Sequence, residues 1–430
     1  MRTAGLVHAI RRTMAPPDGG TLRATYAWTF ASGTLYAGST FLMLMAIGHC
    51  LGAYAGGVFS IALAAAQQLL TLGTFSARTY QVSDLHEKYS FADYLTSRVL
   101  TVGMMLCAGA VWVTFGGFSH DKAMAFLLLL LLKAAEALAD VLEGRYQQKQ
   151  RMDTACRGVF AKTLLALLAF FLVLWRGRSL PAALGAMFLA YLGGLVAVDG
   201  ALVGLFARVS LRFRRRTQLA LLAACFPMFL NAFLMMFVNN APKYALDTFR
   251  DEKAVTHYSA LFMASFVVSL FSMFLLKPML TRFSLAYLEP GKARFLSLLR
   301  AQLRWVGGIA LFCVGAAYLV GIPVLSAGFG LDLSPYRTEL CLLMIGGALM
   351  AFAQVFQSVL VIIRRQAGCL FAIAATATVA FRTASPLVRS HGLAGAAWSY
   401  CASMAVLATI SLSLALVFLR RDRRHRARTA

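Results

Sequence analysis

Segments of about twenty apolar residues recur along the chain, separated by short joints that contain charged residues, glycine or proline. A helix of about this length crosses the hydrocarbon core of a bilayer, because each residue adds about 1.5 Å. The strict apolar–polar alternation that a membrane β-barrel needs is missing from these segments. The pattern therefore predicts about twelve transmembrane helices, at 24–48, 52–76, 97–118, 123–147, 157–175, 180–207, 218–240, 257–276, 302–322, 338–363, 367–388 and 393–419.

The predicted helix 123–147 departs from the apolar pattern. Its run of leucines is followed by polar residues spaced three or four apart, which are Lys133, Glu136, Asp140, Glu143 and Gln147. On an α-helix these positions form one stripe about 80° wide. Facing lipid, the first three would cost about 9 kcal/mol, against about 3 kcal/mol recovered from the leucines. We expect the stripe to face protein or water, either as an ion-pair network between helices or as the lining of a polar cavity.

Composition and charge are those of a polytopic membrane protein. The chain is 60% hydrophobic and 13% charged, with a mean hydropathy of +0.71, which lies outside the range of soluble domains. The net charge of +24 does not indicate nucleic-acid binding, because the basic residues occupy the joints and form no contiguous face. Most of them fall in the inner joints if both termini are cytoplasmic, as the positive-inside rule requires. Cysteine and histidine are dispersed, so we expect neither a metal nor a cofactor.

The chain divides into two halves around its densest internal basic joint, Arg208 to Arg216. Six predicted spans lie on each side, and an even number lets both halves enter the membrane in the same direction. We expect an all-α membrane protein whose halves, 1–210 and 211–430, form two six-helix bundles around a central cleft. The seventh span contains Pro227 and ends in the polar sequence 239–242, and both features can bend a helix.

Several polar motifs follow one another along nearly the whole chain. They are Arg78-Thr79-Tyr80-Gln81-Val82-Ser83-Asp84, then Lys88-Tyr89-Ser90-Phe91 with Asp93, Tyr94 and Arg98, then Lys133, Glu136, Asp140 and Gln147 with Arg151-Met152-Asp153, and finally Asn239-Asn240-Ala241-Pro242-Lys243-Tyr244. Together they resemble the polysaccharide-transport branch of the multidrug/oligosaccharidyl-lipid/polysaccharide exporter superfamily. The resemblance implies a twelve-helix, two-bundle transporter that moves lipid-linked sugar units or related envelope polymers across the bacterial plasma membrane.

The leading hypothesis is a flippase for an oligosaccharide linked to undecaprenyl pyrophosphate. A pyrophosphate group needs cations, and the candidates are Arg78, Lys133, Lys243 and Arg382. Arg382 interrupts an apolar span, where it needs cargo, a water-filled cavity or a carboxylate such as Asp199 or Glu136. Candidate groups for sugar hydroxyls are Gln67, Asn231 and Gln354, each of which could equally form a hydrogen bond between helices.

The carboxylates of the spans are candidates for ion coupling. Glu136 and Asp140 are four residues apart on one helix face, so their charges repel and at least one is expected to hold a proton. Lys133 can neutralise one of them, which leaves Asp140 as the expected proton carrier, and Asp199 is a third candidate. Alternatively, these residues form a static network in which Asp140 only accepts a hydrogen bond.

Two other functions fit a membrane protein of this kind. A cation-coupled multidrug exporter of the same superfamily would share the architecture but would need an anionic, aromatic cavity for cationic drugs. A membrane-embedded glycosyl or polymer transferase would usually need a sizeable catalytic loop, whereas the outer joints are short. For the flippase, the expected partners are the lipid-linked saccharide and membrane lipids, together with glycosyltransferases and a polymerase of the same pathway.

Overall fold

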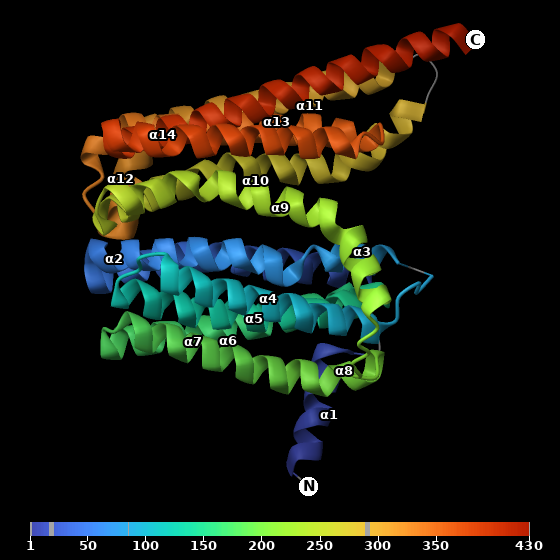
Figure 1. Cartoon of the computed structure of the whole chain (residues 1–430), viewed down its shortest axis with the longest axis vertical. Helices are drawn as coiled ribbons and strands as arrows, with labels where there is room; N and C mark the ends of the chain where they lie inside the picture. The colour runs from blue at the N-terminus through green and yellow to red at the C-terminus, as the bar shows by residue number, and fades with distance from the viewer. Residues whose placement is uncertain (1, 17–20, 85, 289–292, 430) are drawn as a thin grey trace. The chain divides into compact units, whose positions relative to one another are not determined.

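The computed structural model describes residues 2–16, 21–84, 86–288 and 293–429, and the regular structure within these ranges is helical (Figure 1). The elements of the first half are α1 (Arg2–Met14), α2 (Leu22–Thr74), α3 (Ala77–Ser83), α4 (Phe91–Phe115), α5 (His120–Gln148), α6 (Met152–Gly177), α7 (Leu180–Gly194), the π-helical turn η1 (Leu195–Asp199) and α8 (Gly200–Phe206). Those of the second half are α9 (Arg215–Phe249), α10 (Glu252–Leu288), α11 (Ala293–Ala316), the π-helical turn η2 (Ala317–Gly321), α12 (Ile322–Phe329), the 3-10 turn η3 (Ser334–Tyr336), α13 (Arg337–Ile362) and α14 (Gln366–Thr429).

Two of these elements, α2 and α14, each consist of two helices joined at one glycine. Gly52 has φ 81° and Gly392 has φ 59°, a left-handed backbone that residues with a Cβ rarely adopt. Each glycine therefore lets the chain turn between two helices without a longer loop. The breaks coincide with the predicted joints after 48 and after 388.

The predicted number of spans is confirmed. By length and hydropathy, eight described helical stretches qualify as membrane spans, and two of these contain the paired helices of α2 and α14. The remaining two spans are α5 and α10. Helix α5 does not qualify by hydropathy because it carries the charged stripe. With α7, η1 and α8 counted as one span and α11, η2 and α12 as another, the chain has the expected twelve.

Contacts divide the chain into two compact units, Met1–Phe233 and Leu234–Ala430, which we call the first and second bundles. The division falls within α9, because the first part of that helix packs on the first bundle. There Leu221 and Cys225 are buried against Phe75 and Tyr94. The boundary expected at 210/211 and the central cleft expected between the halves stay predictions.

Neither Pro227 nor the polar sequence 239–242 ends the helix of the seventh span. Helix α9 continues through Pro227 and past the polar sequence 239–242 to Phe249. The side-chain amide of Asn240 donates to the carbonyl of Met236 at 3.1 Å, so this polar group is satisfied within its own helix. A polar side chain that bonds within its own helix does not have to end that helix.

Candidate functional site

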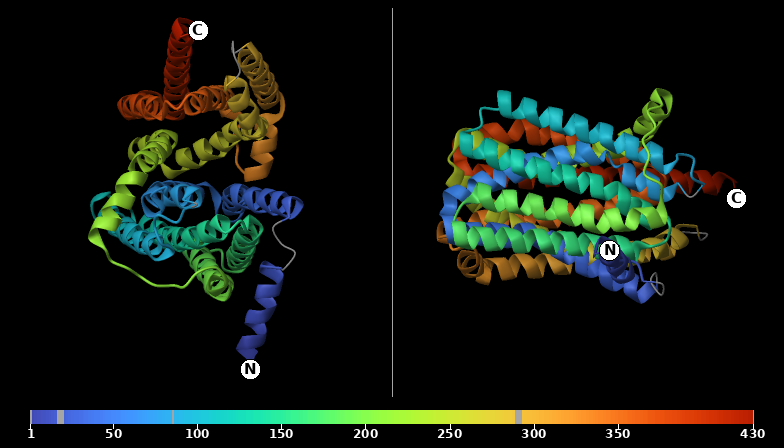
Figure 2. Two further views of the ribbon diagram at one scale, coloured as in Figure 1. Left: turned by 90° about the vertical axis from the view of Figure 1, so that its right-hand side faces the viewer. Right: turned by 90° about the horizontal axis from the view of Figure 1, so that it is seen from below.

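The polar stripe of α5 lies inside the first bundle. Helix α5 packs against α2, α3, α4, α6 and α7, and the helices of the bundle run side by side (Figure 2). The stripe separates into two parts. Asp140, Glu143 and Gln147 belong to an ion network, whereas Lys133 and Glu136 line a small cavity. Both interpretations of the sequence pattern are therefore correct, each for one part of the helix.

Asp140 is held between two arginines from other helices. Its Oδ1 accepts from Arg78 of α3 at 3.1 Å, and its Oδ2 accepts from Arg98 of α4 at 2.7 Å. The same guanidinium of Arg78 also donates to Glu143 at 3.0 Å. The side chain of Arg98 is 1% exposed, and a second guanidinium nitrogen donates to the carbonyl of Gly73 at 2.9 Å, near the end of α2.

The network continues from Glu143 to α6 and η1. The ammonium group of Lys162 donates to Glu143 at 3.0 Å and to Asp199 at 2.6 Å, and its side chain is 0% exposed. The hydroxyl of Tyr146 donates to the other oxygen of Asp199 at 3.2 Å. Three cations and three carboxylates thus alternate along one largely buried network, which is electrically neutral as a whole.

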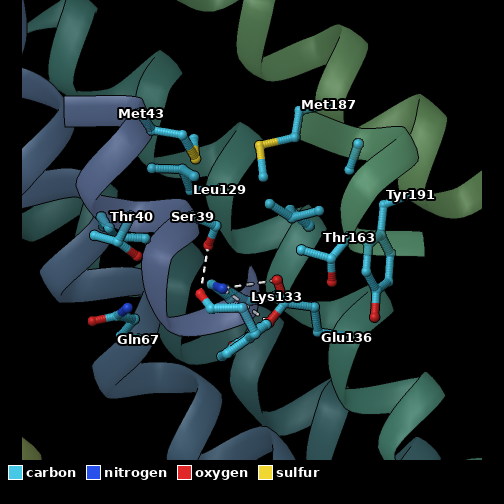
Figure 3. A pocket seen from close by; sticks show the side chains of 14 residues that line it. Ser39, Thr40, Met43, Gln67, Leu129, Lys133, Glu136, Thr163, Met187 and Tyr191 are labelled. Atoms are coloured by element: carbon cyan, nitrogen blue, oxygen red, sulfur yellow. Dashed lines mark hydrogen bonds and ion pairs between the residues drawn. The ribbon is translucent and has the colours of Figure 1, made fainter. Parts of the chain in front are cut away.

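Lys133 and Glu136 form a separate ion pair one turn away on α5. The Nζ of Lys133 donates to both carboxylate oxygens, at 2.8 and 2.9 Å. The hydroxyl of Tyr36 donates to one of them at 2.9 Å, and Lys133 lies 5.5 Å from the centre of that tyrosine ring. Figure 3 shows the pair between Gln67 on one side and Thr163 with Tyr191 on the other.

The cavity around this pair has a volume of about 30 Å³. It is lined by Tyr36, Ser39, Thr40, Met43, Leu63, Gln67, Leu129, Leu132, Lys133, Glu136, Thr163, Ala166, Met187 and Tyr191. A cavity needs a volume of roughly 10–15 Å³ to hold one water molecule, so this cavity has room for about two. It is suited to water, a proton or a small ion, and it is far too small for a sugar.

The structure therefore separates the residues that the sequence analysis grouped together. Lys133 and Gln67 line the small cavity with Glu136, while Arg78 belongs to the ion network with Asp140 and Asp199. The expectation that Glu136 or Asp140 holds a proton rested on repulsion between two neighbouring carboxylates on one helix face. In this structure each has its own cations, and the coupling role of Asp140 stays a prediction.

The other predicted site residues lie on α9, α13 and α14. Lys243 is half-buried, and its ammonium group lies 5.1 Å from the centre of the Phe262 ring. Arg382 is exposed on α14 and forms no ion pair with any residue that the structure describes. Asn231 and Gln354 are half-buried on α9 and α13. Their roles in binding stay predictions.

Sequence reasoning missed two of the most buried charges, Arg98 and Lys162. Neither is among the candidate site residues of the sequence analysis. Yet Arg98 falls within the predicted span 97–118, and Lys162 falls within 157–175. A charge inside a predicted span is the signal that would have found them, since such a charge needs a partner.

The loop between α3 and α4 is held in place by the carboxylates of Asp84 and Glu87, which lie outside the spans. Burial raises the pKa of Asp84, but hydrogen bonds from the backbone N–H groups of Tyr89 and Lys88 outweigh it, so the pKa lies below its ordinary value. Hydrogen bonds from Lys149 and Arg145, both on α5 or at its end, lower the pKa of Glu87. The bonds to Glu87 fasten this loop to the end of α5.

The pairing of Glu87 predicts a pH-dependent contribution to stability. We expect Glu87→Gln to be slightly less stable than the parent near neutral pH, by a small amount because the pair is partly exposed. Since folding lowers the pKa of Glu87, its contribution is present above the unfolded value of about 4.3 and is lost as the pH falls through the lower folded value. Thermal unfolding of both proteins across this pH range tests the prediction. A difference that grows toward acid pH would contradict it.

Solved structures of known proteins share this arrangement of helices. An inward-facing multidrug resistance MATE family transporter of the MOP superfamily matches with a TM-score of 0.68 and 14% identity, over 91% of this chain and 95% of that one. The lipid II flippase MurJ in an inward closed conformation matches with a TM-score of 0.67 and 13% identity, over 90% of this chain and 86% of that one.

The chain has the fold of these transporters. A third structure, the MATE multidrug transporter DinF-BH, matches with a TM-score of 0.61 and 14% identity, over 95% of this chain and 98% of that one. No family model matches the sequence, and no curated protein matches it. At such low identity the likeness establishes the fold, a multi-pass helical membrane protein with two bundles, and leaves the cargo to be argued from this chain's own residues.

Proposed function

We propose that this chain is a flippase that moves lipid-linked oligosaccharide or polysaccharide units across the bacterial plasma membrane, from the cytoplasmic to the outer leaflet. The fold supports transport, since the solved structures that share it carry the names of multidrug transporters and of a lipid II flippase. The work of such a protein is binding and reorientation, so no residue is assigned a catalytic role. Both termini are placed in the cytoplasm, because that orientation puts most basic joints on the inner side.

The observation that carries the proposal is the different pairing of charges in the two bundles. In the first bundle, Glu136, Asp140 and Asp199 each bind a lysine or an arginine. In the second, Lys243 and Arg382 form no ion pair with a described carboxylate. Positive charge is therefore left for an anionic group such as a pyrophosphate, which charge-assisted hydrogen bonds would hold.

A cation-coupled multidrug exporter is the second candidate, because MATE transporters and MurJ resemble this chain to a similar degree. A cationic drug would need a carboxylate that is free to receive it. The carboxylates of the α5 stripe are already paired, which favours an anionic cargo. A transferase is less well supported, because the described connections between spans offer no loop large enough for a catalytic site.

Reconstitution tests the proposal directly. Purified protein in proteoliposomes should speed the movement of an undecaprenyl-pyrophosphate-linked saccharide between leaflets, measured by the fraction that becomes accessible to a membrane-impermeant reagent. The cationic dye ethidium, tested in parallel, should not be transported. Transport of ethidium without movement of the lipid-linked saccharide would refute the flippase and support the exporter. Protein-free and heat-inactivated liposomes supply the background rate.

A further inference from the structure

We propose that Lys133 is a tethered cation that permanently fills a monovalent-cation site on Glu136, so that the first bundle works without binding sodium. The inference concerns cation binding and holds whichever cargo the chain carries. It starts from the position of the ammonium group, which contacts both oxygens of the carboxylate. That is the position a bound metal cation would take.

The surroundings of Glu136 are suited to a hard cation. Tyr36 contributes a hydroxyl oxygen 2.9 Å from the carboxylate, and the cavity lining adds the oxygen-bearing side chains of Ser39, Thr40, Gln67 and Thr163. Hydroxyl, amide and carboxylate oxygens are the ligands that hard cations prefer. The site therefore has the chemistry of an oxygen-lined cation site whose carboxylate is bound by an ammonium group of the protein.

The charge balance leaves no place for a second cation. Lys133 and Glu136 are the charged residues in the described lining of the cavity, and they cancel each other. The neighbouring ion network adds no net negative charge, because its cations balance its carboxylates; its members are Arg78, Arg98, Lys162, Asp140, Glu143 and Asp199. A sodium ion at Glu136 would have to displace the ammonium group of Lys133. That group cannot diffuse away, because Lys133 belongs to the same helix and precedes Glu136 by three residues.

Removing the tethered cation should therefore create a sodium site. Lys133→Ala frees the carboxylate and enlarges the cavity, while the oxygen-bearing side chains stay in place. Purified full-length protein is unfolded thermally in sodium chloride or in choline chloride at equal ionic strength. A ligand that binds only the folded state stabilises it in proportion to the logarithm of its concentration. For Lys133→Ala we expect a saturable stabilisation by sodium, reaching about a hundredfold shift in the unfolding equilibrium at a sodium concentration about one hundred times its Kd.

Two comparisons make the result decisive. The double variant Lys133→Ala/Glu136→Gln lacks the carboxylate and should show no sodium effect beyond the baseline of ionic strength. The parent should behave like this double variant, and any sodium response that the two share arises elsewhere in the chain. The proposal would be overturned if sodium stabilises the parent more strongly than the double variant, even if Lys133→Ala does not fold. It would also be overturned if Lys133→Ala folds and sodium does not stabilise it. A Lys133→Ala variant that folds only in the presence of sodium would support the proposal.

Discussion

Replacing Lys162 with methionine should destabilise the first bundle by about 3–5 kcal/mol, because it leaves a buried carboxylate without its cation. Asp199 is 2% exposed, and Lys162 is the cation bound to it among the described residues. Tyr146 supplies one hydrogen bond to Asp199 and no charge. We expect a large fall in the thermal unfolding midpoint, or loss of folded protein, measured by size-exclusion chromatography of detergent-solubilised samples.

Arg98→Met is the matched comparison, since Arg98 is also buried and also binds a carboxylate of this network. Asp140 keeps Arg78 when Arg98 is removed, and the carbonyl of Gly73 keeps a bond from Thr101 at 2.7 Å. Arg98→Met should therefore be less harmful than Lys162→Met. The double variant Lys162→Met/Asp199→Asn should recover part of the lost stability, because it removes the unpaired charge. Equal losses in the two single variants, or no recovery in the double variant, would show that the alternating network is not what stabilises the bundle.

Arg382→Gln and Lys243→Met should each reduce the initial rate of flipping at least about tenfold. The reason is that a hydrogen bond to a charged group contributes about 1.5–3 kcal/mol, and each 1.4 kcal/mol corresponds to a factor of about ten. Neither side chain has a described carboxylate partner, so their removal should not unpair a buried charge. The measurement is the leaflet-exchange assay with the undecaprenyl-pyrophosphate-linked saccharide, on variants that elute as folded protein.

Two controls separate charge recognition from a general loss of basic residues. Arg382→Lys keeps the charge but loses the planar fork that binds two oxygens at once, so it should retain more activity than Arg382→Gln and less than the parent. Arg176→Gln removes an exposed arginine from the end of α6 and should leave the rate unchanged. Normal transport by folded Arg382→Gln would remove Arg382 from headgroup binding.

The sequence by itself determined the class of the protein and the number of its spans. A segment of about twenty apolar residues must become a helix in a bilayer, since lipid cannot satisfy the backbone polar groups in any other local form. This constraint acts on each segment separately, so it can be applied without knowing the neighbours. It also showed that the stripe on α5 must be covered, because the cost of its charges in lipid depends only on the segment's own residues.

The tertiary structure decided which charges meet. Glu136 and Asp140 lie four residues apart on one helix, yet Glu136 pairs with Lys133 of the same helix while Asp140 is held by Arg78 and Arg98 from α3 and α4. Ion pairs between helices depend on which helix faces lie together and on which residues come level with one another along the helix axes. Those facts come from packing along the whole bundle and are not contained in any single span. For the same physical reason Lys162, which was not among the candidate site residues, joins Glu143 to Asp199 within the network.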